Sequence, residues 1–182
     1  MMKQPESWQT AEIPGPTKAL VISKPEVIVG MIKSAKRPVL IVGPESAEQK
    51  VGNEKQIDQL IRIAEAGGIP IVATSRTVAE FAKRNYKPVS WMPAVDIANR
   101  LRDPEWTGAE EKGQHDLAIL TGMKYYVEWL LLSGLKHFGG KLRTISLDRY
   151  YQPHANWSFP NISQQEWEQS LIAIQNGLRR SS

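Results

Sequence analysis

The chain has 182 residues, of which 41% are hydrophobic and 23% charged, with a formal net charge of +4. This composition excludes a largely disordered chain, and the absence of cysteine excludes a disulfide scaffold, a thiolate zinc site and an iron–sulfur cluster held by this chain. Scattered positive charges predict no nucleic-acid partner. Because no apolar run is long enough for a membrane span or a signal peptide, we expect no membrane partner and a soluble, cytoplasmic protein.

Residues 1–18 form a proline-rich segment. Pro5, Pro14 and Pro16 disfavour a helix there and predict an extended arm. Trp8 and Ile13 in this arm are available to pack on the rest of the chain or on another subunit. We expect residues 19–182 to form a single α/β domain of the nucleotide-binding type.

Within that domain, helical periodicity alternates with short apolar runs. Apolar residues at helical spacing predict helices near 25–35, 57–67, 78–82, 94–101, 124–138 and 163–178. Continuous apolar runs predict buried strands at 38–43, 69–73 and 117–122, and a more amphipathic strand at 142–147 is expected nearer the sheet edge. Strands that alternate with helices indicate a parallel sheet. The predicted fold class is therefore α/β, with one doubly wound, mostly parallel sheet and helices on both faces.

Three helix boundaries carry specific signals. The pair Gly67-Gly68 is typical of a helix end. Ser75 is a candidate N-cap for the short helix that follows it, and Ser163 with Glu166 has the spacing of a capping box.

The residues after the predicted strands are candidates for binding a cofactor. Open parallel sheets bind ligands beyond the carboxyl ends of their strands, and Gly, Ser and Thr at helix starts suit a phosphate or pyrophosphate. The candidates are Gly43, Pro44, Glu45, Thr74, Ser75, Gly122, Met123, Lys124 and Tyr125. However, every parallel sheet needs turn and capping residues at these points, and the chain has no G-x-G-x-x-G or Walker motif. A dinucleotide site and ordinary turns both remain open at this stage.

No catalytic or metal-binding set is predicted. His115, His137 and His154 lack the spacing of metal ligands. The chain also has no G-x-S-x-G motif and no recognisable pair of nucleophile and base.

Several aromatic residues lie in polar segments of the chain. They are Trp91, Trp106, Tyr150, Tyr151 and Trp157. Two interpretations have equal weight: these side chains pack long loops over the sheet, or they form a partner surface, where Trp and Tyr are enriched.

Several runs of the sequence together resemble one known family. They are SAKRPVLIVG (34–43), DPEW (103–106), DLAILTGMKYY (116–126) and LSGLKHF (132–138), followed by shorter matches at 144–146, 149–150, 158–159 and 161–163. In order and spacing these runs resemble the epsilon subunit of the archaeal acetyl-CoA decarbonylase/synthase complex. The resemblance covers about residues 19–175 and is weakest in the arm and at 44–56.

The resemblance implies a fold similar to the NAD- or FAD-binding domains of the deoxyhypusine-synthase-like group. It also implies a partner, the large nickel–iron–sulfur alpha subunit of carbon monoxide dehydrogenase, and pairing of the chain with a second copy. Nickel and iron–sulfur centres would belong to the partner, which agrees with the absence of cysteine. The role implied is to stabilise the alpha–epsilon assembly or to help electrons pass to FAD.

Three functional hypotheses follow. In the first, the chain is a non-catalytic subunit that contacts its partner through the proline-rich arm and the loops that carry tryptophan, among them the loop with Trp106. In the second, it is a stand-alone FAD- or NAD-binding electron-transfer module, with Tyr125 or Tyr126 near the cofactor ring. In the third, it is a transferase of the deoxyhypusine-synthase type, which needs a reactive lysine that the sequence does not identify.

Overall fold

The computed structural model describes residues 15–74 and 76–180. Its main sheet has the strand order β1-β9-β8-β7-β2-β5-β6, and every neighbouring pair of strands is parallel. The strands are β1 (Leu20–Val21), β2 (Pro38–Val42), β5 (Ile71–Thr74), β6 (Ser90–Met92), β7 (Leu117–Thr121), β8 (Arg143–Ser146) and β9 (Trp157–Ser158). A separate antiparallel pair consists of β3 (Lys50–Val51) and β4 (Glu54–Lys55).

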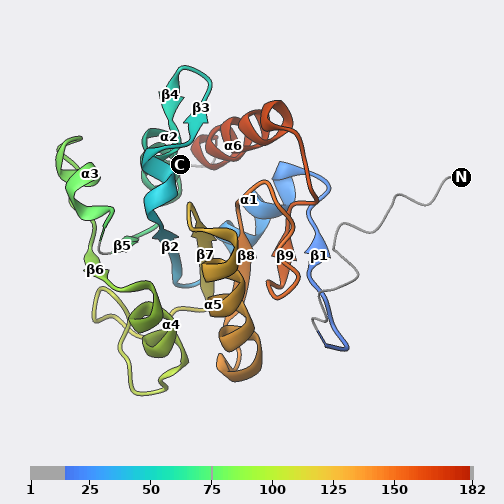
Figure 1. The fold of residues 1–182 in the computed structure, drawn as a ribbon. Coiled ribbons are helices and arrows are strands. Elements are labelled where there is room, and N and C mark those ends of the chain that lie inside the picture. Colours follow the sequence, from blue (N-terminus) through green and yellow to red (C-terminus); the bar gives the residue numbers. More distant parts are fainter. Residues whose placement is uncertain (1–14, 75, 181–182) are drawn as a thin grey trace, which may run out of the picture.

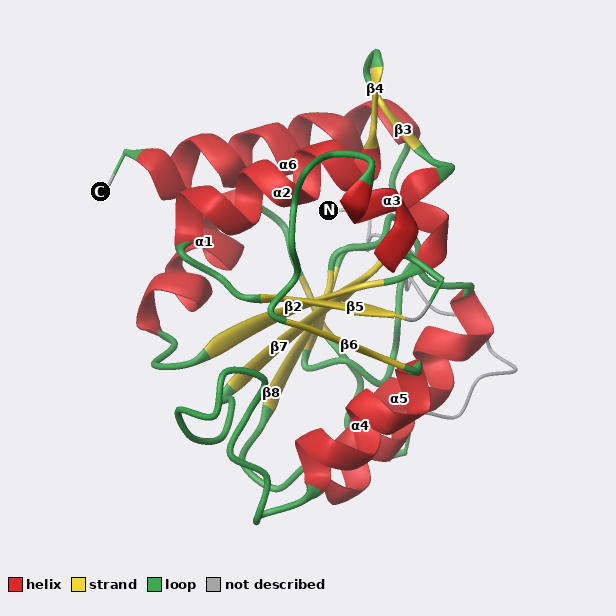
Figure 2. Ribbon diagram, turned by 90° about the vertical axis from the view of Figure 1, so that its left-hand side faces the viewer, coloured by secondary structure: helices red, strands yellow, loops and turns green. Residues whose placement is uncertain are grey.

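Helices cover both faces of this sheet. They are α1 (Pro25–Ser34), α2 (Gln56–Gly67), α3 (Val78–Ala82), α4 (Ala94–Arg102), α5 (Tyr125–Phe138) and α6 (Gln164–Arg179). Figure 1 shows β1 and β6 at opposite edges of the sheet. In Figure 2, α1, α2 and α6 lie on one face and α4 and α5 on the other. The predicted doubly wound α/β class is therefore confirmed.

The central strands supply apolar side chains to two cores. In β2, Leu40 and Val42 belong to the core under α1, α2 and α6, whereas Val39 and Ile41 belong to the core under α4 and α5. Successive side chains of a strand point to opposite faces, so a strand covered on both faces needs apolar residues at every position. This requirement explains the continuous apolar runs in the sequence.

Two of the predicted helix boundaries are confirmed. Gly68 caps the end of α2 with a positive φ of 59°, which a residue without a Cβ adopts easily. At the start of α6, the Glu166 backbone N–H donates to the Ser163 hydroxyl at 3.3 Å, and the Ser163 backbone N–H donates to the Glu166 carboxylate at 2.9 Å. Ser75 lies outside the described residues.

The structure corrects the predicted edge position of residues 142–147. The strand there, β8, lies inside the sheet between β7 and β9, and β1 extends the sheet further. Thr144 of β8 has its partner within the fold: its backbone N–H and its hydroxyl donate to the Asn156 side-chain oxygen at 2.7 and 3.1 Å. Strands as short as β1 and β9 form no periodic pattern, so the sequence did not indicate that they lie outside β8 and extend the sheet.

The predicted arm lies mostly outside the described residues, which begin at Gly15. The Thr17 carbonyl accepts a hydrogen bond from the Lys136 amine on α5. The chain then joins the sheet, since the Ala19 backbone N–H donates to the Pro153 carbonyl at 3.0 Å. None of the described helices is both long and apolar enough to cross a membrane.

Candidate functional site

The strand order reverses between β2 and β7, and the loops after these two strands meet there. The chain adds β5 and β6 on one side of β2, and β7, β8 and β9 on the other. After β2, the residues Pro44–Ala47 form a 3₁₀ helix, η1. The Gly43 backbone N–H donates to the Thr121 carbonyl at 2.9 Å, and the Glu45 backbone N–H donates to the Gly122 carbonyl at 2.8 Å. The structure thus brings these two groups of candidate residues together.

The two loops are packed against each other without space between them. A Cβ placed on Gly43 would lie 2.3 Å from the Gly122 carbonyl oxygen and 2.4 Å from the Met123 side chain. Gly122 has a φ of +71°, and a Cβ there would lie 2.8 Å from the Ser46 Cβ. Glycine is required at both positions by close approach, and at Gly122 also by backbone conformation.

This packing engages the backbone N–H groups that would bind a phosphate. Besides the N–H groups of Gly43 and Glu45, that of Ser46 donates to the Gly43 carbonyl at 3.3 Å. The Gly122 N–H donates to the Asp148 carboxylate at 2.9 Å. A pyrophosphate at a glycine-rich turn needs such groups free to donate. As arranged here, these residues do not fit the pyrophosphate of FAD or NAD.

The acidic side chains at the junction of β2 and β7 also make it unsuitable for a pyrophosphate. Glu45, Glu128 and Asp148 gather at the carboxyl ends of the central strands, and the cation Lys124 acts on Glu45. Burial, followed by the charges of Asp148 and Glu48, raises the pKa of Glu45. Burial of Glu128 against Asp148 raises the pKa of Glu128 well above its ordinary value. Acidic groups gathered in this way disfavour the binding of a further anion such as a pyrophosphate.

The other candidate residues lie beside this junction or point away from it. Met123 is buried in the core under α5. The Tyr125 hydroxyl donates to the Tyr151 carbonyl at 3.0 Å, so its ring faces the segment after β8. Lys124 and Tyr126 are exposed.

Thr74 ends β5 and is buried. Its hydroxyl lies 2.8 Å from the Thr77 hydroxyl, and the latter is 3.2 Å from the Val42 carbonyl. These contacts tie the end of β5 to the end of β2. The hydroxyl of Thr74 is therefore used within the fold.

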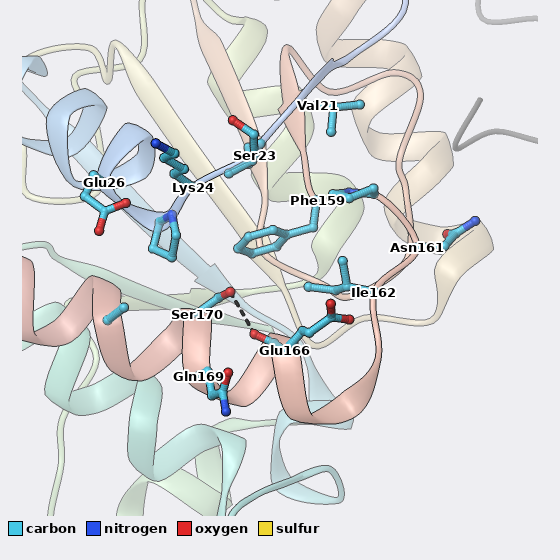
Figure 3. A pocket seen from close by; sticks show the side chains of 14 residues that line it. Val21, Ser23, Lys24, Glu26, Phe159, Asn161, Ile162, Glu166, Gln169 and Ser170 are labelled. Carbon is cyan, nitrogen blue, oxygen red and sulfur yellow. Dashed lines mark hydrogen bonds between the residues drawn. The ribbon is translucent and has the colours of Figure 1, made fainter. Parts of the chain in front are cut away.

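A groove of about 840 Å³ lies elsewhere, between α1, α6 and the segment after β9 (Figure 3). It is lined by apolar side chains such as Phe159 and by polar ones such as Lys24 and Gln169. Ser170 on its wall donates to the Glu166 carbonyl at 2.8 Å (Figure 3). None of the described candidate residues lines this groove. Its lining comes from β1, α1, α6 and the 159–162 segment, which no motif in the sequence links.

His115 and His154 make contacts within the fold. His115 lies 3.1 Å from the Arg37 carbonyl through Nδ1 and accepts a hydrogen bond from the Ala109 backbone N–H at 3.0 Å through Nε2, which holds the loop before β7. His154 is buried edge-on against Trp129, with ring centroids 4.5 Å apart. No group of three or more potential metal ligands occurs among residues 15–74 and 76–180.

His154 makes stability depend on pH. Burial, together with the charges of Lys136 and His137, lowers the pKa of His154 to about 4. A histidine titrates near pH 6.5 in an unfolded chain. The contribution of the neutral His154 ring to the stability of the fold is therefore complete above that pH and is lost as the pH falls toward 4. We expect His154 to contribute a loss of about 2 kcal/mol in the free energy of unfolding between pH 7 and pH 5, and this contribution should be absent from the His154→Phe variant.

Urea unfolding at a series of pH values measures this difference. His137→Gln, which removes an exposed histidine and only the smallest of the three causes of the lowered His154 pKa, is the control. Its pH curve should depart from that of the unmodified chain far less than the curve of His154→Phe. Parallel pH curves for the unmodified chain and His154→Phe would contradict the assignment.

The aromatic residues of the polar segments divide between the two interpretations. Tyr151 is buried and Trp157 packs against the core. Trp106 is half-buried against His115, with ring centroids 5.6 Å apart. Trp91 is 63% exposed and Tyr150 is 48% exposed. These five residues therefore do not form one partner surface.

Comparison with known proteins identifies the family. Residues 1–176 match the family model described as CO dehydrogenase beta subunit/acetyl-CoA synthase epsilon subunit. The chain is 35% identical over 160 residues to the acetyl-CoA decarbonylase/synthase complex subunit epsilon of Methanothermobacter thermautotrophicus, covering 88% of each chain. It is 36% identical over 162 residues to the subunit of the same name from Methanothrix soehngenii, covering 88% of this chain and 83% of the relative. It is 40% identical over 141 residues to subunit epsilon 1 of the same complex from Archaeoglobus fulgidus, covering 77% of this chain and 73% of the relative. The chain therefore belongs to the family of CO dehydrogenase beta subunits and acetyl-CoA synthase epsilon subunits.

Proposed function

We propose that this chain is an accessory subunit of an acetyl-CoA decarbonylase/synthase complex and that it stabilises the assembly by docking on the large nickel–iron–sulfur carbon monoxide dehydrogenase subunit. Its relatives are named as epsilon subunits of that complex. The described residues include no group of three or more potential metal ligands. Nickel and iron–sulfur chemistry belongs to the partner in this proposal.

The observation that carries the proposal is an exposed apolar surface on α4 and α5, here named the α4–α5 outer face. It consists of Val95, Tyr126, Leu130 and Phe138, which are 61%, 61%, 61% and 67% exposed. The two helices pack side by side on the same face of the sheet (Figure 2). Large apolar side chains grouped on a surface favour contact with another protein, because association removes them from water.

Two further observations favour a protein as the partner of the α4–α5 outer face. Arg102 of α4 lies over the Phe138 ring at 5.4 Å, which links the two helices at this surface and adds a cation. Tyrosine and arginine are enriched at the centres of protein interfaces. The opposite sides of the same helices are filled by Ile97, Leu131 and Leu135 in the core, so the outer face is not needed for folding.

Co-purification with the partner tests the proposal. We expect Leu130→Glu to weaken association with the large subunit at least about tenfold, because it buries a charge in an apolar contact. Ile172→Glu is the matched control: Ile172 is 46% exposed on α6, which covers the opposite face of the sheet. Both variants should keep the melting temperature of the unmodified chain. Equal retention of both variants by the large subunit would refute docking through the α4–α5 outer face.

Transfer of electrons to FAD stays a prediction of the family resemblance. The hydrogen bonds and acidic groups at the junction of β2 and β7 give it no support. The deoxyhypusine-synthase-type transferase also stays a prediction, and no described lysine is singled out for it.

A further inference from the structure

Glu128 is a buried carboxyl group that the proposed docking function does not use. It lies in the first turn of α5, is fully buried, and neither of its carboxyl oxygens has a hydrogen-bond partner of normal geometry. The hydroxyl of Ser146, which is also fully buried at the end of β8, lacks a partner as well. An isolated ionised carboxylate in such a place is strongly disfavoured, because burial removes its hydration.

Asp148 is held facing Glu128 by a chain of donors. The Thr121 hydroxyl donates to the Asp148 carboxylate at 2.7 Å, and the Gly122 backbone N–H donates to the same oxygen at 2.9 Å. The Thr121 hydroxyl in turn accepts a hydrogen bond from the Gln56 side chain on α2 at 2.7 Å. Asp148 therefore acts as an acceptor, and the side chain of Glu128 interacts with it directly.

We propose that Glu128 keeps its proton at neutral pH and donates a hydrogen bond to Asp148, and that this carboxyl pair closes the junction of β2 and β7 to anionic dinucleotides. The pair stands at the place in the sheet where a dinucleotide pyrophosphate would lie. A proton on Glu128 supplies a donor toward Asp148 and avoids two negative charges that would repel each other.

The surrounding charges support this arrangement. Burial first, and then the charge of Asp148 and its interaction with the Glu128 side chain, raise the pKa of Glu128. The Ser146 hydroxyl lowers this pKa, Glu45 on η1 raises it, and the pKa stays well above its ordinary value. Lys124, on the loop before α5, acts on Glu45 and lowers the pKa of that group. A pyrophosphate would add two negative charges beside Asp148 and Glu45. It would also have to displace the hydrogen bonds that join the two loops.

The protonated state predicts a specific dependence of stability on pH. The glutamic acid of an unfolded chain ionises near pH 4.3, whereas Glu128 stays neutral in the folded chain. Its contribution to stability is therefore complete below that pH and is lost as the pH rises. We expect the unfolding equilibrium constant to grow by about tenfold per pH unit from this group between about pH 5 and pH 7.

Comparison of Glu128→Gln with the unmodified chain isolates this contribution. The amide has nearly the shape of the protonated acid and can donate to Asp148, but it does not titrate. The tenfold-per-unit increase should be absent from Glu128→Gln. Glu26→Gln, in the first turn of α1 and exposed, is the matched control and should leave the slope unchanged. Equal slopes for the unmodified chain and Glu128→Gln would overturn the proposal.

Carbon NMR of the unmodified chain with ¹³C-labelled glutamate carboxyl groups gives a second test that needs no variant. We expect one glutamate signal to remain at the neutral-acid position at pH 7, and millimolar FAD or NAD to leave it unchanged. The proposal fails if all signals are those of ionised groups. It also fails if either dinucleotide shifts the neutral signal in a saturable way. None of these results depends on docking, so this proposal and the docking proposal can fail independently.

Discussion

Replacement of Trp167 by alanine is expected to lower the free energy of unfolding by about 3–5 kcal/mol. Trp167 on α6 is fully buried, and its indole N–H donates to the Leu147 carbonyl at 2.7 Å. The substitution removes a large apolar side chain, leaves a cavity between α6 and the sheet, and leaves the carbonyl without its donor. The expected loss is a large fraction of the total stability of an ordinary domain, about 5–15 kcal/mol.

Urea or thermal unfolding measures this loss, and Trp91→Ala is the matched control. Trp91 is the same residue type on the edge strand β6, where it is 63% exposed, so its truncation should change stability by less than about 0.5 kcal/mol. A loss below about 1 kcal/mol for Trp167→Ala would contradict the role given to this side chain in the core.

The Gly43→Ala variant is expected to lose about 2–3 kcal/mol. The backbone of Gly43 is not strained, since its φ is −91°. The destabilisation comes from contact: the added Cβ would lie 2.3 Å from the Gly122 carbonyl oxygen, so the two loops would have to separate. Separation weakens the hydrogen bond from the Gly43 N–H to the Thr121 carbonyl, at the end of the central pair of strands.

Gly30→Ala provides the control for this variant. Gly30 lies in α1 with no atom within 4 Å of an added Cβ, and alanine favours a helix by about 0.5–1 kcal/mol. Both substitutions restrict the unfolded chain equally, so their difference reports the contact at the junction of β2 and β7. A neutral result for Gly43→Ala would mean that the loops separate easily and that the junction is open enough for a ligand.

The closed junction of β2 and β7 helps to choose between the proposed functions. A dinucleotide at the usual place in an open α/β sheet needs free N–H groups and an approachable backbone. Here Gly43 and Gly122 bring the two loops into contact with each other, and Asp148 occupies the Gly122 N–H. In this fold the loops at the carboxyl ends of β2 and β7 are closed against each other. Four large exposed apolar side chains, Val95, Tyr126, Leu130 and Phe138, lie on the neighbouring helices α4 and α5. Docking on a partner is the function that this distribution favours.

The strands and helices that could be predicted are those with long periodic patterns. The apolar runs in β2, β5 and β7 and the capping box at Ser163 are local properties of the chain, and the structure places all of them as expected. The prediction was wrong for β8, whose polar residues suggested an edge position. Thr144 pairs with Asn156, twelve residues away, and this partner cannot be identified from a local pattern.

The candidate site shows the same division between local and distant interactions. Strands and helices alternate in the sequence, which predicts a parallel sheet. Because parallel strands have their carboxyl ends on the same side of the sheet, the loops after them were expected to meet there. Whether their N–H groups remain free depends on which carbonyl or carboxylate each one reaches in space. Gly122 and Asp148 are 26 residues apart, and Gln56 and Thr121 are 65 apart. Local patterns were thus sufficient for the fold class, since burial on two faces repeats along each strand. The packing of distant residues was needed to close the site and to bury Glu128, since no short stretch of sequence contains both partners of those contacts.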